Sequence, residues 1–220
     1  MTPPNAAGCR LDHLVVVAAD LERGAHEISA RLGVPLQPGG VHPAMATHNR
    51  LLRLGDDAYL EVIAPTHALP PPARRRWFGL DDVEPAAPAR LATWAVRSSD
   101  VAATAAAAAE PLGEIEALSR GALRWRITVP GDGGLVLGGV APAIIEWPPQ
   151  VQIAPQLNDV GCALRRLEIH HPAPDRVRAL LRSLSLDERD LVVRALPPGG
   201  APYLTAHLDT PHGTTVIDGR

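Results

Sequence analysis

The sequence contains no lysine: all 21 basic residues are arginine, against 24 acidic residues. The formal net charge of −3 gives no electrostatic reason to expect nucleic acid or an anionic membrane as a partner. The only basic run is Arg74–Arg76, and three charges are typical of a solvated loop. Arginine without lysine, together with abundant alanine and proline, indicates the coding bias of a GC-rich bacterial genome.

Cysteine and long apolar runs are also scarce. The two cysteines, Cys9 and Cys162, form neither a CxxC motif nor a metal-type spacing, so we expect two small buried side chains. No run approaches the roughly 18–20 apolar residues that a membrane span needs. The N-terminal residues lack the basic and then apolar pattern of a secretory signal. We therefore expect a cytoplasmic protein.

The common catalytic motifs are missing as well. The sequence has no HExxH, no GxSxG, no P-loop and no GxGxxG after a predicted strand. Gly131–Gly134 is typical of a hairpin turn rather than a phosphate loop. Any chemistry must therefore come from side chains that the fold brings together.

What the sequence does contain is an internal repeat. Three segments, Leu11–Gly33, Leu91–Gly113 and Leu164–Leu186, each begin with a short apolar run, continue with a polar break and end with a helical stretch. Asp20 and Asp100 stand where a helix-capping carboxylate is expected. Strand-like runs separated by turn residues follow each helix, so each unit has the order β-α-β-β-β.

These patterns predict an α+β fold of repeated βαβββ modules, whose curved mixed sheets surround a cleft with the helices outside. The first module is expected over residues 9–66 and the second over 91–148. A third, incomplete module over 160–218 would cover a sheet edge or make a contact in a homodimer. Residues 67–90 form a linker rich in proline and arginine.

The linker contains Arg76–Leu80 (RWFGL), which is unusually aromatic for a chain with only 3% aromatic residues. We expect this segment to pack back onto the fold. It is either a lid over the cleft or a hydrophobic anchor that holds the linker down.

Three segments of the first module, Leu11–Gly24 (LDHLVVVAADLERG), His42–Gly55 (HPAMATHNRLLRLG) and Tyr59–Pro65 (YLEVIAP), together resemble the glyoxalase-like branch of the vicinal-oxygen-chelate superfamily. Ile144–Pro148 (IIEWP) resembles the same branch at the end of the second module. Ala46 replaces a glycine that is common there. The resemblance covers roughly residues 11–148 and implies two modules paired around a cleft.

In members of this superfamily that bind metal, the ligands stand on the first and last strands of each module. The resemblance therefore implies His13 and Glu61 as ligands from the first module, and Glu146 as a ligand or catalytic carboxylate from the second. The remaining position falls on Thr93, a poor ligand. His48 is a candidate for the missing ligand or for an acid–base group, and His42 stands close enough in the sequence to reach the cleft.

The strand pattern leaves alternatives open. His48 shares a face with Arg50, while Asn49 shares the other face with Leu51, and the sequence does not say which face meets the cleft. His13 could be an ordinary hydrogen-bonded core residue, and Glu61 could be paired with an arginine of the neighbouring strand. The expected substrate cleft consists of five residues: Asn49, Arg50, Trp77, Trp94 and Trp147.

The leading hypothesis is an enzyme that uses a divalent transition metal (Zn, Mn, Fe or Ni) and acts on a small molecule with adjacent oxygen atoms. Isomerase, lyase and ring-opening dioxygenase reactions all remain open, because a fold does not determine a reaction. The alternative is a metal-free protein of the bleomycin-resistance type that sequesters a small molecule in the same cleft. Thr93 favours the alternative, and the pair of His13 and Glu61 favours the enzyme.

Overall fold

The computed structural model describes residues 8–186 and 190–220. The first module consists of β1 (Arg10–Val17), α1 (Leu21–Leu32), β2 (Gln37–His42), β3 (Thr47–Leu54) and β4 (Ala58–Pro65). The second consists of β5 (Arg90–Arg97), α2 (Val101–Ala107), β6 (Glu114–Arg120), β7 (Leu123–Val129) and β8 (Ala143–Glu146). Both have the βαβββ order, and the predicted α+β class is confirmed.

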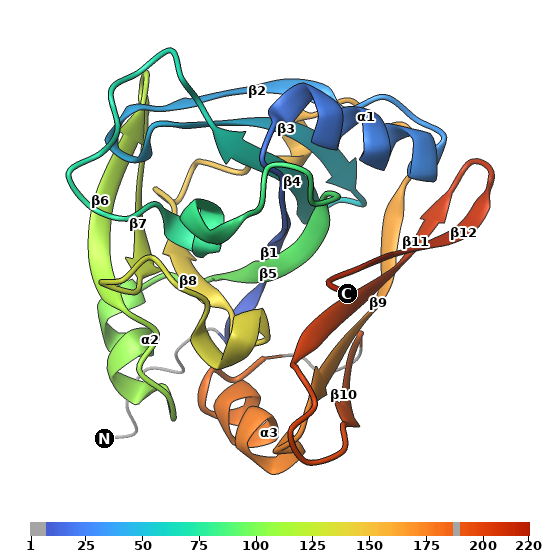
Figure 1. The fold of residues 1–220 in the computed structure, drawn as a ribbon. Helices are drawn as coiled ribbons and strands as arrows, with labels where there is room; N and C mark the ends of the chain where they lie inside the picture. Colours follow the sequence, from blue (N-terminus) through green and yellow to red (C-terminus); the bar gives the residue numbers. More distant parts are fainter. Residues whose placement is uncertain (1–7, 187–189) are drawn as a thin grey trace.

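The two modules share one eight-stranded sheet with the strand order β2-β3-β4-β1-β5-β8-β7-β6 (Figure 1). Within each module the last strand runs parallel beside the first, β4 beside β1 and β8 beside β5. The modules meet at the centre, where β1 and β5 pair antiparallel. The sheet therefore has approximate two-fold symmetry about this central pair.

Both faces of the sheet are covered, which explains why β1 is buried along nearly its whole length. Leu14 and Val16 point into a large core on the convex face, whereas Val15 and Val17 point into a second core on the concave face. Helices α1 and α2 pack against the convex side of β4 and β8. The concave face is left for the linker and for a pocket.

The three helices are short. The Asp20 side chain accepts a hydrogen bond from the Arg23 amide (2.8 Å) at the start of α1, and Asp100 caps α2 through the amides of Ala102 and Ala103. α1 ends at Gly33, whose φ of 72° is easily adopted by glycine. Within residues 8–186 and 190–220, no helix is both long and apolar enough to cross a membrane.

The C-terminal part forms a separate four-stranded sheet. Its elements are β9 (Ala163–His171), α3 (Pro174–Ser183), β10 (Leu191–Ala195), β11 (Tyr203–Thr210) and β12 (Gly213–Asp218), in the strand order β10-β9-β11-β12. The sequence predicts a third module over 160–218, of which residues 187–189 lie outside the described part of the chain. The order of elements along the chain agrees, but β10 rather than β12 runs parallel beside β9.

The C-terminal part therefore has the βαβββ order of elements but not the strand pairing of the first two modules. The chain leaves β9, crosses through α3 and returns directly beside β9, which is the connection of a simple βαβ unit. Apolar periodicity predicts which segments are strands, but it does not say which strands become neighbours.

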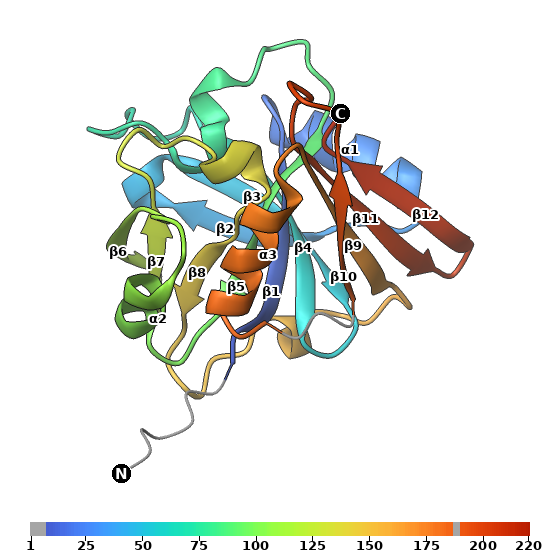
Figure 2. The ribbon, with the colours of Figure 1, turned by 90° about the horizontal axis from the view of Figure 1, so that it is seen from below.

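The four-stranded sheet and α3 close the large core from the convex side (Figure 2). Leu167 and Ile169 of β9 and Leu180 of α3 are fully or almost fully buried there together with residues of β1, β4 and β5. The C-terminal part is thus a structural cover for the convex face.

The linker segment η2 (Trp77–Asp82) lies on the opposite, concave face. Trp77 and Phe78 are almost completely buried there, in one core with Ala92 and Ala95 of β5. The expectation that this aromatic segment packs back onto the fold is confirmed, and Trp77 becomes part of the pocket wall described below.

Trp94 tests the packing of the convex core. Its side chain is 0% exposed, and its indole N–H donates to the Val140 carbonyl at 3.0 Å. We expect Trp94→Ala to lower the free energy of unfolding by about 3–5 kcal/mol, because a large cavity replaces the ring. Urea denaturation followed by circular dichroism measures this change.

The matched control is Val41→Ala, because Val41 is 42% exposed and should change stability by less than about 0.5 kcal/mol. A loss for Trp94→Ala no larger than that of the control would contradict this packing.

Candidate functional site

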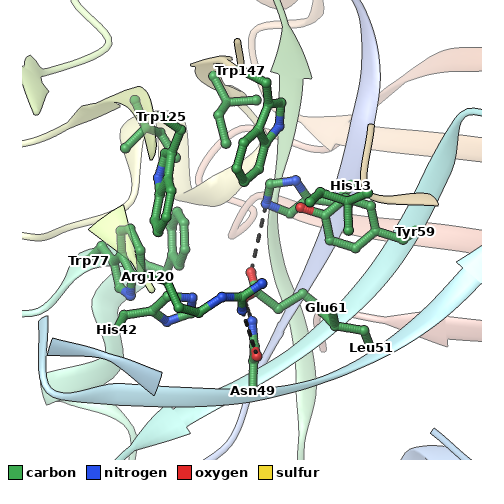
Figure 3. Close-up of a pocket in the computed structure, with 14 residues that line it drawn as sticks. His13, His42, Asn49, Leu51, Tyr59, Glu61, Trp77, Arg120, Trp125 and Trp147 are labelled. Carbon is green, nitrogen blue, oxygen red and sulfur yellow. Dashed lines mark hydrogen bonds and ion pairs between the residues drawn. The ribbon is translucent and has the colours of Figure 1, made fainter. Parts of the chain in front are cut away.

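A pocket opens on the concave face, and both modules and the linker contribute to its wall (Figure 3). The residues that line it are His13, His42, Asn49, Leu51, Tyr59, Glu61, Trp77, Phe78, Arg120, Trp125, Ile127, Ile145, Trp147 and Ile153. Most of these side chains are apolar or aromatic, so the few polar groups stand out as the candidates for chemistry.

The centre of the pocket is the pair of His13 on β1 and Glu61 on β4. His13 Nε2 and Glu61 Oε2 are 3.7 Å apart, and the side chains of both residues are more than nine-tenths buried. The strands bring the two residues close because β1 and β4 are parallel neighbours, with Val15 opposite Glu61. An imidazole and a carboxylate thus face each other across a short gap, too wide for a good hydrogen bond.

In each residue of this pair, the polar atom that does not face the other residue contacts a further side chain. His13 Nδ1 is 2.7 Å from Asp12 Oδ1, and Asn49 Nδ2 donates to Glu61 Oε1 at 2.5 Å. Gly40 donates its backbone N–H to Asn49 Oδ1 at 2.7 Å, which sets the orientation of the amide. As a result, the free atoms of the pair, Nε2 and Oε2, are the ones that converge.

Asp12 and His13 are consecutive in a strand, yet they touch each other beside the same pocket. An irregularity in the pairing of β1 with β5 explains this, because Leu11 lies opposite Val96 while His13 lies opposite Ala95. One extra residue on β1 is characteristic of a β-bulge, and a bulge re-aims the side chains around it. Periodic alternation in the sequence gives no sign of this bulge.

The Asp12 carboxylate is 1% exposed and is surrounded by donors. Arg97 Nε donates to Oδ2 at 2.9 Å, and the Trp147 indole N–H lies 3.2 Å from the same oxygen. Burial by itself would raise the pKa of Asp12, but its interactions with His13 and Arg97 outweigh it and lower that pKa. Asp12 is therefore a stable anion behind His13.

His42 and Tyr59 complete the polar wall. His42 Nδ1 is 3.0 Å from Thr47 Oγ1, and its ring meets Trp77 edge-on at 5.2 Å between ring centres. Burial lowers the pKa of His42 to about 4, so this imidazole is neutral near pH 7. Tyr59 stacks on the His13 ring at 4.7 Å, and burial raises its pKa, so it remains a phenol.

His48 and Arg50 do not join the pocket, which corrects their expected roles in the cleft. Both lie on the face of β3 that also carries Leu52 and Leu54, and these leucines point into the convex core. Arg50 pairs with Glu22 of α1 at 2.6 Å. Partial burial lowers the pKa of His48. The face that meets the pocket is the other one, with Asn49 and Leu51.

Glu146 also points away from His13. It accepts a hydrogen bond from the Val101 amide at the start of α2 (2.7 Å) and pairs with Arg126 (2.6 Å). The strand register gives the reason. Val15 lies opposite Glu61 in the first module, and the corresponding residue of the second, Ala95, lies opposite Ala143. The position equivalent to Glu61 is therefore Ala143, three residues before Glu146.

Thr93 and Trp94 occupy opposite faces of β5. The Thr93 hydroxyl donates to the Ala141 carbonyl at 3.3 Å, and its side chain faces the concave side, next to Trp77 and Phe78. Trp94 does not line the pocket, which corrects its expected place in the cleft, because strand alternation turns it into the convex core. The other two predicted tryptophans, Trp77 and Trp147, do line the pocket.

The structure thus gathers His13, Glu61, Asn49, Trp77 and Trp147 around one pocket. It adds residues that sequence reasoning missed: Asp12, Tyr59, Arg120 and Trp125. The order Asp12-His13 was visible, but only the bulge makes the two act together. Arg120 ends β6 at the far edge of the sheet, and no sequence signal connects it to the first module.

The donor set can be compared with what a divalent metal needs. His13 Nε2 and Glu61 Oε2 are chemically suitable, and a separation of 3.7 Å lets both reach one ion at about 2.0–2.2 Å. A carboxylate behind the ligating imidazole is the usual outer partner of such a site. No cluster of three or more His, Cys, Asp or Glu suited to a metal occurs among the described residues. The pocket therefore fits two coordination positions.

The comparison with protein families agrees with this architecture. A family model described as a glyoxalase-like domain matches residues 11–185, which is most of the chain. No curated protein matches the sequence. Among solved structures, a hypothetical protein from Staphylococcus aureus has a TM-score of 0.52 at 10% identity, covering 96% of this chain and 85% of that one.

Two methylmalonyl-CoA epimerases are also similar, at lower TM-scores. The enzyme from Mycobacterium tuberculosis has a TM-score of 0.43 at 20% identity, covering 68% of this chain and 95% of that one. A Streptomyces coelicolor variant has a TM-score of 0.43 at 18% identity, covering 64% and 99%. The extent of the family match, together with the paired βαβββ modules, shows that the chain belongs to the glyoxalase-like domain family of the vicinal-oxygen-chelate superfamily.

Proposed function

We propose that this protein is an enzyme that acts, with the help of a divalent metal ion, on a small molecule carrying adjacent oxygen atoms. The observation that supports this most strongly is the convergence of His13 Nε2 and Glu61 Oε2 at 3.7 Å. Their outer atoms are already engaged by Asp12 and Asn49. The two donor atoms are held in place, but they do not form a hydrogen bond with each other. This arrangement favours a metal ion bound between them.

In this proposal His13 and Glu61 hold the ion, and adjacent oxygens of the substrate occupy further positions. When bound, a divalent ion supplies Lewis-acid polarisation of a carbonyl oxygen. Two protein ligands leave further coordination positions open for a chelating ligand. Members of the same superfamily commonly use divalent metals, which is consistent with this arrangement.

The surrounding residues prepare the site. Asp12 keeps the proton of His13 on Nδ1, so Nε2 carries the free lone pair. Asn49 leaves Glu61 Oε2 as the free carboxylate oxygen. Trp77, Trp125 and Trp147 exclude bulk water from the pocket, and this strengthens each polar interaction inside it.

The donor set also favours one class of reaction. Non-haem iron oxygenases typically use two histidines and one carboxylate, whereas this pocket offers one of each at the converging point. A rearrangement or elimination needs only polarisation of a carbonyl and movement of a proton. We therefore place the activity in the isomerase or lyase class rather than with ring-opening dioxygenases.

A second candidate function is metal-free binding of a small molecule. Its specific support lies in the second module, where Thr93 and Ala143 stand at the positions of His13 and Glu61. Neither side chain is a good metal ligand, and the tryptophan walls suit a flat apolar ligand.

Metal binding separates the two candidates. We expect metal-free protein to bind about one Mn²⁺, Fe²⁺, Ni²⁺ or Zn²⁺ per chain in calorimetric titration, because two buried donors converge. His13→Ala and Glu61→Ala should each weaken binding by at least about 10-fold, since each removes a ligand.

His48→Gln and Glu146→Gln are matched controls, because both residues lie outside the pocket, and they should bind metal like the wild type. If the wild-type protein binds none of these ions, metal assistance is wrong and the binding protein is favoured. Equal losses in the controls would contradict the assignment of the donors.

His42 gives a prediction about pH. Its pKa is lowered to about 4 in the folded protein, against 6.5 for the free side chain. Between these values the unfolded chain binds the proton more tightly, so the stability of metal-free protein should fall as the pH drops from about 7 to 4. The contribution of His42 to this fall is of the order of 2–3 kcal/mol.

Denaturation with urea at pH 7 and pH 5 measures this loss. His42→Gln should lose less stability over this interval than the wild type, because it has no imidazole to protonate. His26→Gln, at an exposed position of α1, should behave like the wild type. The same pH dependence in His42→Gln as in the wild type would show that another group is responsible.

A further inference from the structure

Two nitrogen donors of residues that line the pocket lack the partners that such groups normally have. The first is the Trp77 indole: the residue is only 3% exposed, and within the described part of the chain its N–H has no hydrogen-bond acceptor. Most buried indole N–H groups do find an acceptor. Trp94 and Trp147 follow this rule, since they donate to the Val140 carbonyl and to Asp12.

The second is Arg120. Its guanidinium reaches into the pocket, but its one side-chain hydrogen bond among the described residues is a long one, 3.4 Å to Asn49 Oδ1. None of the ion pairs of residues 8–186 and 190–220 includes it. Three other partly buried arginines are paired with carboxylates: Arg97 with Asp12, Arg76 with Asp81 and Arg74 with Glu116.

The fold makes room for Arg120 at this place. β6 and β2 are the two edges of the curved sheet, and they approach each other across the concave face. A side chain at Gly40 of β2 would come within 2.6 Å of Arg120 Cδ. Glycine at position 40 therefore lets Arg120 cross to Asn49 and lie near the His13–Glu61 pair, as Figure 3 shows.

An unpaired guanidinium and an unpaired indole N–H in a tryptophan-lined pocket are suited to an anion with several acceptor oxygens. The inner space of the pocket is about 30 Å³, room for about two water molecules. This inner space takes the polar end of a small ligand, and the rest of the ligand lies in the open part of the pocket.

We propose that the pocket binds a small carboxylic acid with an oxygen on the neighbouring carbon, such as a 2-oxo acid. Its carboxylate contacts Arg120 and the Trp77 indole N–H. The neighbouring oxygen lies toward His13 and Glu61, and this second contact rests on the proposed function. The carboxylate contact does not depend on a metal.

The test compares two probes of nearly equal size and shape in calorimetric titration with EDTA present. 2-Oxobutyrate carries the carboxylate, and 2,3-pentanedione replaces it with a neutral acyl group. We expect wild-type protein to bind 2-oxobutyrate at least about 10-fold more tightly than the diketone, because charge-assisted hydrogen bonds add to its binding.

Substitutions test which residues cause the preference for 2-oxobutyrate over the diketone. Arg120→Met should weaken binding of 2-oxobutyrate by about 10- to 100-fold and leave the diketone unchanged. Trp77→Phe keeps an aromatic wall without the N–H, and should weaken 2-oxobutyrate by about 3- to 10-fold. Arg124→Met is the matched control on the same hairpin, and it should bind both probes like the wild type. Circular dichroism checks that each variant is folded.

The double variant His13→Ala/Glu61→Ala separates this inference from the proposed function. If it still prefers 2-oxobutyrate, the carboxylate site stands whether or not metal binding is found. The inference is overturned if wild-type protein binds both probes equally, if it binds no 2-oxobutyrate at millimolar concentration, or if Arg120→Met retains the preference.

Discussion

The antiparallel pairing of β1 with β5 is the constraint on which the rest of the structure depends. It joins the two modules into one curved sheet, and it places the first strand of each module at the centre of the concave face. The same pair contains the bulge at Leu11–His13, and the bulge lets Asp12 contact His13, which lines the pocket. The pairing of β1 with β5 therefore determines the symmetry of the fold, and the bulge at Leu11–His13 within it places Asp12 against His13.

Buried charge is the second constraint on this site. Asp12 and Glu61 are both carboxylates in a low-dielectric surrounding, where an isolated charge would be very unfavourable. Asp12 is compensated by Arg97 and by donors from His13 and Trp147. Among the residues that the structure describes, Glu61 has only the Asn49 amide as a close donor, and His13 lies just beyond hydrogen-bond distance. The charge of Asp12 is therefore well compensated, whereas the charge of Glu61, on the pocket side of His13, is not. This difference is expected for a site that binds a cation or a ligand.

The sequence predicted the elements of the fold well, because apolar periodicity and capping residues such as Asp20 are local signals. It could not predict how the C-terminal strands pair, since β10 and β12 look alike as strands. For the site, the resemblance pointed to His13 and Glu61, which the structure brings together. Glu146 was assigned to the pocket from the similarity of a sequence motif. The strand register instead puts Ala143 at the position equivalent to Glu61. Arg120 was beyond reach, since only closure of the sheet brings β6 near β2.

The two modules have similar backbones but unequal chemistry, and the linker explains how this asymmetry is accommodated. At the positions of His13 and Glu61, the second module has Thr93 and Ala143, whose small side chains leave space on its half of the concave face. Trp77 and Phe78 of the linker fill that space, packed against Ala92, Ala95 and Ala143. An insertion between the modules thus replaces a second pair of donors with aromatic surface. The result is a one-sided pocket in which the first module provides the His13–Glu61 pair, while the linker and the second module provide the walls and the positive charge of Arg120.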